Sequence, residues 1–129
     1  DVDACKRLST AARTAAERRG RALDITFHMA FDALPVEGQL DAIDRLAEMG
    51  TARILTHGGA AGTPIEGNVD RLRRLMAYAR GRVVVLPGAG ITYGNVAHIA
   101  RELDAGELHG TRIVDMRTGP ADRERFGVI

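Results

Sequence analysis

The stretch TFHMAFD, residues 26–32, decides the fold prediction, because it is an apolar run that becomes polar where it ends. Two later stretches have the same form, RILTHGG at residues 53–59 and PGAGI at residues 87–91. In parallel α/β proteins the functional loops begin where the strands end, so they share one edge of the sheet. We therefore predict that these three strand ends form one rim.

Helical periodicity fills the intervals between the apolar runs. Apolar residues recur at helical spacing in residues 3–19, 37–49, 64–81 and 92–103. Strands are predicted at residues 23–28, 52–56, 83–86 and 107–113. Thr63, Pro64 and Glu66 have the spacing of a capping box and predict where the third helix begins. The alternation of helices and strands indicates an α/β fold with a parallel sheet.

The composition is that of an ordinary globular domain. The chain has 129 residues, of which 45% are hydrophobic and 27% charged, and its formal net charge is +1. We expect one domain over residues 1–129, with residues 116–129 as a loose tail. Aromatic residues make up only 4% and no basic stripe is visible, so we expect no nucleic acid partner. We expect no membrane partner either, because no apolar run approaches the roughly 18 residues of a span.

Two histidines stand at predicted strand ends and are the first candidate functional residues. His28 lies on the same strand face as Thr26, and His109 on the same face as Glu107. We expect the two imidazoles to converge at the rim, with Asp32 following His28 in the next loop. Two imidazoles and a carboxylate can bind a borderline metal or act as acid and base. A purely structural hydrogen-bonding role is the alternative for each histidine alone.

Glycine-rich loops follow the second and third predicted strands. Glycine lets backbone N–H groups approach an anion closely, and such loops bind phosphate in many barrel enzymes. The candidate substrate- or anion-binding residues are Thr56, Gly58, Gly59, Gly88 and Gly90. The alternative is that these glycines only make tight turns, since neither loop contains Lys or Arg.

Four further residues have predicted structural roles. Strand alternation turns Arg53 and Glu107 toward the same interior, which predicts a buried ion pair. Asn95 is expected to pin its loop through backbone hydrogen bonds. His98 lies within a helical segment and is expected at the surface.

Taken together, TFHMAFD, RILTHGG, PGAGI with Asn95, and ELHGT at residues 107–111 resemble the C-terminal half of the CutC copper homeostasis proteins. The resemblance implies a partial TIM (β/α)8 barrel containing the last four parallel strands with alternating helices. It also implies a cytoplasmic location, which the single cysteine suits, and a role in copper handling. Met29 departs from the family's Arg, and His57 and Thr111 each depart from a Ser. A half barrel exposes a sheet edge, so we expect a homo-oligomer or a longer chain.

Two functions remain open at this point. In the first, the chain binds copper at the rim through His28, His57 and His109. Copper(I) prefers sulfur ligands, for which the candidates are Cys5, Met29 and Met116. In the second, the chain is a barrel enzyme of the lyase or isomerase type that acts on a small carbonyl or phosphorylated metabolite. His28 or His109 would then be the acid or base and Asp32 would orient it.

Overall fold

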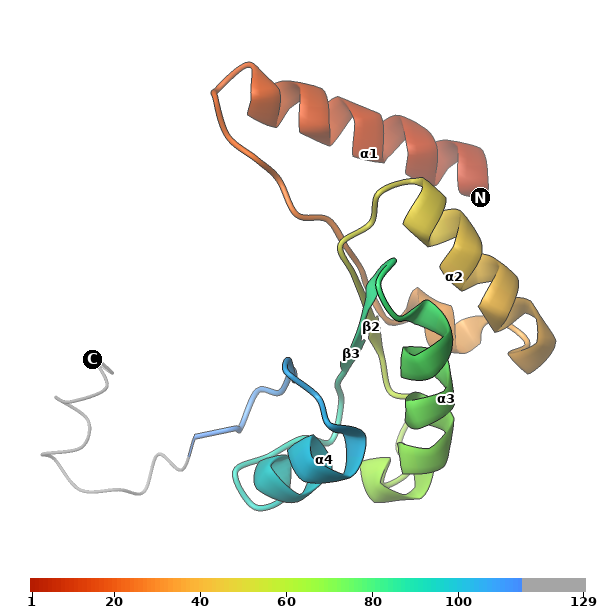
Figure 1. Cartoon of the computed structure of the whole chain (residues 1–129), viewed down its shortest axis with the longest axis vertical. Coiled ribbons are helices and arrows are strands. Elements are labelled where there is room, and N and C mark those ends of the chain that lie inside the picture. Colours follow the sequence, from red (N-terminus) through yellow and green to blue (C-terminus); the bar gives the residue numbers. More distant parts are fainter. Residues whose placement is uncertain (115–129) are drawn as a thin grey trace, which may run out of the picture.

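A computed structural model describes residues 1–114, which form a parallel sheet covered by helices (Figure 1). The strand order is β1-β2-β3, and both strand pairs are parallel. This confirms the α/β class. The helices and strands are α1 (Val2–Glu17), β1 (Thr26–Phe27), α2 (Gln39–Glu48), β2 (Arg53–Thr56), α3 (Val69–Ala79), β3 (Val84–Pro87) and α4 (Val96–Leu103). Single turns of 3-10 helix, η1 (Met29–Ala33), η2 (Val36–Gly38) and η3 (Ile65–Asn68), precede α2 and α3.

The main core lies between one face of the sheet and helices α2 and α3. Alternation along the strands turns Ile54 and Val85 toward these helices, where Ile43 of α2 and Leu75 of α3 meet them. The periodic residues Ile43 and Leu46 of α2 and Leu72 and Leu75 of α3 are buried, as the sequence pattern predicts, whereas Leu40 on the α2 stripe is 42% exposed. Phe27 packs against the same core.

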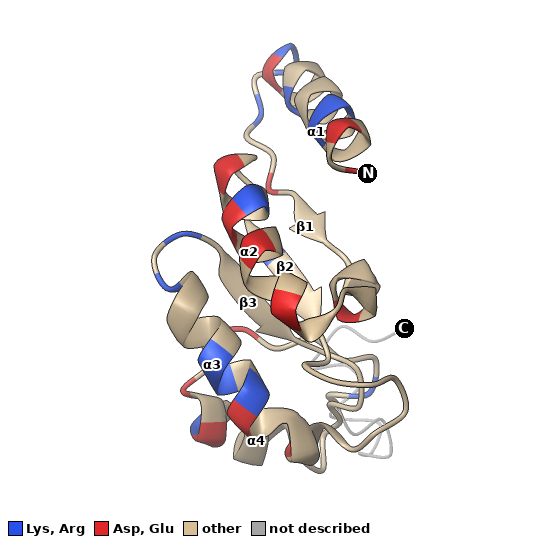
Figure 2. Ribbon diagram, turned by 90° about the vertical axis from the view of Figure 1, so that its right-hand side faces the viewer, with Lys and Arg blue, Asp and Glu red and all other residues tan. Residues whose placement is uncertain are grey.

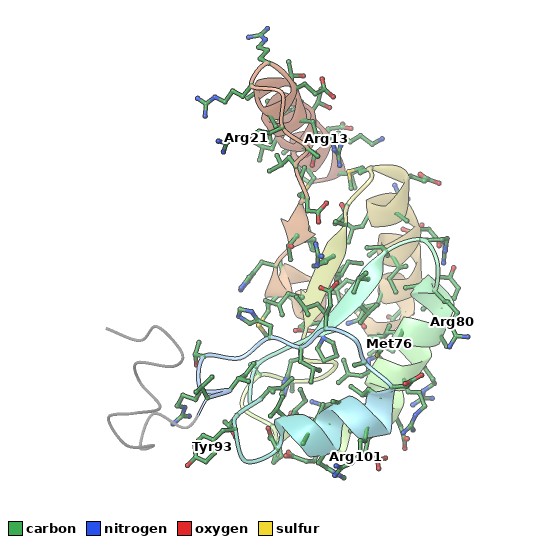
Figure 3. The ribbon with its side chains drawn as sticks, turned by 60° about the vertical axis from the view of Figure 1, so that its left-hand side comes forward. Arg13, Arg21, Met76, Arg80, Tyr93 and Arg101 are labelled. Atoms are coloured by element: carbon green, nitrogen blue, oxygen red, sulfur yellow. The ribbon has the colours of Figure 1, made fainter. Side chains whose placement is uncertain are left out.

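A second core forms where α4 packs against α3. Ile99 of α4 and Leu72 of α3 are both completely buried there, together with Ile65 of η3. Met76 of α3 contacts both cores, and Figure 3 shows its side chain on the inner side of the helix, whereas Arg80 points outward. The two cores hold the loops after β2 and β3 against α3.

Helix α1 lies beyond one end of the sheet and contains no buried residue (Figure 1). Its predicted apolar stripe exists, but Leu8 on that stripe is 72% exposed. The guanidinium of Arg13 donates to the carbonyl oxygen of Gly50 at 2.7 Å and ties the helix to the end of α2. Charged residues occupy much of the surface of α1 and α2 (Figure 2).

The predicted fourth strand is wrong for residues 107–113. The amide of His109 donates to the carbonyl oxygen of Pro87 at 2.9 Å, and Thr92 forms a single bridge with Arg112. Between these contacts Gly110 lies close to the carbonyl group of Ile91, where a Cβ atom would collide with the oxygen. The segment therefore runs beside the loop after β3 with isolated contacts and forms no continuous ladder with it. The sheet of the described residues has three strands, so the four-stranded half barrel is not what the structure shows.

The predicted capping box is also wrong. The hydroxyl of Thr63 donates to the carbonyl oxygen of Ala60 at 2.8 Å, and the carboxylate of Glu66 accepts from Asn95 at 2.7 Å. Both side chains are thus used in loop contacts, and the chain passes through η3 before α3 begins at Val69. Helix α4 likewise begins at Val96, later than its predicted start at Thr92.

The ion pair of Arg53 and Glu107 forms as predicted, but it is not buried. The Arg53 Nε and Glu107 Oε2 atoms are 2.5 Å apart, and Asp24 accepts from the same guanidinium at 2.8 Å. The Glu107 side chain remains 42% exposed because no described element covers this face of the sheet. The predicted loose tail at residues 116–129, and Met116 with it, lie outside the described residues.

Candidate functional site

A pocket of about 220 Å³ opens at the carboxyl ends of the strands and brings the two predicted histidines together. His28 enters it from the end of β1, and His109 enters from the segment that follows α4. Met29 lines the same pocket, and Leu55 forms part of its wall. Both histidines are exposed residues, so a ligand can approach them from solvent.

Asp32 does not join these histidines as their orienting carboxylate. One of its oxygens accepts a short hydrogen bond from the Thr56 hydroxyl, and the other accepts from the His57 amide at 2.8 Å. The Thr56 hydroxyl oxygen also accepts from the Gly58 amide at 3.0 Å. Asp32 and the fully buried Thr56 therefore fix the turn after β2 and lie outside the pocket.

His57 also stands apart from the other two histidines. Its side chain is only 2% exposed and does not line the pocket. Its Nδ1 atom lies 3.1 Å from the Ala89 carbonyl oxygen and 3.3 Å from that of Gly88. Its Nε2 atom lies 2.9 Å from the Thr63 carbonyl oxygen and 3.2 Å from the Thr63 hydroxyl. The ring thus joins the loop after β2 to the loop after β3, outside the pocket.

The candidate glycines divide between the pocket and the interior. Gly90 lines the pocket, and Gly88 lies against Leu55 and His109, which both line it. Gly58 and Gly59 face the other way: a Cβ atom on Gly58 would lie 2.6 Å from Leu72 Cγ, and one on Gly59 would collide with Asn68. Close packing therefore explains glycine at these two positions without a ligand.

Asn95 pins the loop after β3, as predicted. Its side-chain oxygen accepts from the Thr92 amide at 2.8 Å, and its side-chain nitrogen donates to the Gly90 carbonyl oxygen at 2.9 Å. The same nitrogen donates to Glu66, and hydrogen bonds from the Glu66 backbone and from Asn95 hold the pKa of that carboxyl below its ordinary value. His98 is exposed on α4, as expected.

The charged residue of the pocket that the sequence analysis did not predict is Arg112. It lies three positions beyond His109, within the segment predicted as the fourth strand, and the residue is exposed. The signal for it in the sequence is its proximity to His109. Cys5, a candidate sulfur ligand, lines a different groove between α1 and α2.

Residues 1–114 contain no group of three or more His, Cys, Asp or Glu side chains that could hold a metal ion. A metal at this pocket would therefore use fewer protein ligands of those types, or a thioether. None of the helices in these residues combines the length and apolar character that crossing a membrane needs.

Comparison with known proteins identifies the family. The model of the CutC family matches residues 1–114. A CutC family protein of Enterococcus faecalis is 59% identical over 92 residues, and one of Streptococcus pyogenes is 36% identical over the same length. Each match covers 71% of this chain and 44% of the relative, so the chain spans less than half the length of these relatives.

A solved structure supports the same assignment. The crystal structure from Streptococcus agalactiae, named as a copper homeostasis protein CutC, has a TM-score of 0.69 and 40% sequence identity. The similarity covers 72% of this chain and 44% of that one. The motifs, the fold and the relatives agree, and the chain belongs to the CutC family.

Proposed function

We propose that this chain binds a copper ion at the rim pocket, with His28, His109 and Met29 as the ligand side chains. The observation that carries the proposal is that these three side chains line one pocket, although they come from segments far apart in the sequence. The printed name of the Streptococcus agalactiae neighbour, copper homeostasis protein, supports the choice of metal. We propose further that the chain is part of a TIM barrel and acts in the cytoplasm.

The donor set suits copper(I) better than a hard cation. Imidazole nitrogen is a good ligand for copper, and the soft thioether of methionine selects copper(I). Both histidines are exposed, and Met29 is half-buried. No carboxylate lines the pocket, so a hard cation such as Mg²⁺ would find none of its preferred ligands among the described side chains.

The test is a copper(I) competition titration of the purified protein beside His28→Ala/His109→Ala. We expect one copper per chain in the wild type and at least a tenfold loss of affinity in the double variant. His98→Ala is the matched control, because His98 is an exposed histidine that does not line the pocket. Equal affinity in all three proteins would contradict the proposed site.

A single variant tests the thioether. Met29→Leu keeps the volume of the side chain and removes the sulfur, so we expect weaker binding of copper(I) with little effect on folding. The affinity for copper(II), which does not favour thioether sulfur, should change much less. A loss of affinity that is equal for both oxidation states would remove Met29 from the ligand set.

Arg112 supports a second candidate, an enzyme acting on a phosphorylated or carboxylated metabolite. Arg112 lines the pocket together with His28 and His109. A guanidinium binds phosphate or carboxylate, and imidazoles can act as acid and base. Arg112→Met should then abolish binding of inorganic phosphate while leaving copper(I) affinity within about twofold. Phosphate binding that is absent in the wild type would exclude this candidate.

A further inference from the structure

We infer that His57 is a positioning residue for the rim pocket, because its Nδ1–H holds the turn at residues 88–90 that forms one wall. This inference rests on the proposed copper site but concerns a side chain that does not touch the ligand. The His57 ring is buried and does not line the pocket.

Both ring nitrogens of His57 face carbonyl oxygens, which only accept. Nδ1 lies beside those of Gly88 and Ala89, and Nε2 lies 2.9 Å from that of Thr63. The Thr63 hydroxyl near Nε2 donates its own hydrogen to Ala60. We place a hydrogen on Nδ1, where it is donated to the turn at residues 88–90.

The turn that receives this bond needs to be held. Ala89 has φ +63°, a left-handed conformation that a residue with a Cβ adopts only when surrounding contacts enforce it. His57 binds the carbonyl of Ala89 from one side, and Asn95 binds that of Gly90 from the other. The carbonyls of this turn are thereby occupied by side chains that lie outside the pocket.

The turn at residues 88–90 lies against His109, one of the proposed copper ligands. A Cβ atom placed on Gly88 would lie at an ordinary packing distance, 3.5 Å, from the Cβ atom and the carbonyl oxygen of His109, so His109 lies beside this turn. The His109 amide also bonds to Pro87, the residue before the turn. A shift of the Gly88–Ala89 peptide would therefore displace His109 in the pocket.

Two variants separate positioning from plain packing. In His57→Asn the side-chain amide nitrogen replaces Nδ1 and keeps the bond to the turn. In His57→Gln it replaces Nε2 and keeps only the bond to Thr63. Asn and Gln are both polar and no larger than His. If His57 only filled space, the two variants would therefore change copper affinity and exchange rates alike.

The experiment measures copper(I) affinity by competition and amide hydrogen exchange of residues 88–90 in the metal-free variants. We expect His57→Asn to stay within about twofold of the wild type, and His57→Gln to lose about tenfold in affinity, the lower end for loss of a supporting partner of a metal ligand. Exchange at residues 88–90 should accelerate only in His57→Gln. Equal behaviour of the two variants in both measurements would overturn the inference.

The wild-type protein gives an independent readout. Nitrogen-15 shifts of the His57 ring should show a protonated Nδ1, and an unprotonated Nδ1 would overturn the inference even if neither variant folds. If the wild type binds no copper(I), the proposed function fails, and the ring shifts and the exchange rates still decide the role of His57.

Discussion

Replacing Gly58 with alanine is expected to destabilise the fold by about 2–5 kcal/mol, a value that combines two effects. Gly58 has φ +75°, and a left-handed conformation costs a residue with a Cβ atom about 1–2 kcal/mol. The new Cβ atom would also lie 2.6 Å from Leu72 Cγ and 2.8 Å from Leu72 Cδ2. Leu72 is completely buried and cannot move freely, so overpacking adds about 1–3 kcal/mol.

The chain supplies a matched control in Gly62. This glycine has φ +83°, but a Cβ atom there would meet nothing within 4 Å. Gly62→Ala should therefore show only the backbone cost of about 1–2 kcal/mol. Urea unfolding of both variants, extrapolated linearly to water, measures the difference between them, provided that the slope with urea is unchanged.

The difference between the two variants isolates the contact with Leu72. We expect Gly58→Ala to be less stable than Gly62→Ala by about 1–3 kcal/mol. Equal destabilisation would refute the reasoning, because it would mean that the loop after β2 shifts and accommodates a methyl group at no cost. The role of Gly58 would then need another explanation, such as the anion site predicted from the sequence.

Two further predictions concern carboxylates on opposite sides of the sheet. Asp32→Asn should destabilise the fold by about 1–3 kcal/mol in urea unfolding, because an amide has one acceptor oxygen for the two donors of Thr56 and His57; an unchanged midpoint would contradict it. The hydrogen bond and positive charge of Arg53 lower the pKa of Glu107. This pair therefore contributes stability above the ordinary pKa of glutamate, and the contribution is lost as the pH falls through the lowered value. A carboxyl titration by nuclear magnetic resonance should show the Glu107 midpoint rising in Arg53→Ala.

Much of the fold follows from local patterns in the sequence. The helical spacing of Ile43 and Leu46 in α2 predicts the face that meets the sheet, and both are buried. Alternation in β1 predicts that Phe27 faces the core and Thr26 the other side. The prediction that His28 and His109 meet is met by the pocket they share, although His109 reaches it from a segment that is not a strand.

The predictions that are wrong concern residues whose contacts come from distant parts of the sequence. The stripe of α1 predicts burial, but no described element covers Leu8. Thr63 is a residue type that caps helices, but its hydroxyl donates to the carbonyl oxygen of Ala60 and lies beside the ring of His57. The interior roles of Asp32 and His57 depend on partners from other loops, which spacing along the chain does not reveal.

The charged row of Asp24, Arg53 and Glu107 has a consequence for misfolding. Side chains of a strand alternate between its two faces, so a slip of β2 by one residue would exchange the positions of Arg53 and Ile54. The guanidinium would then enter the apolar layer under α2 and α3 without either carboxylate, at a large desolvation cost. These ion pairs therefore disfavour the shifted strand pairing. In the native pairing they contribute little to stability, because they are exposed to solvent.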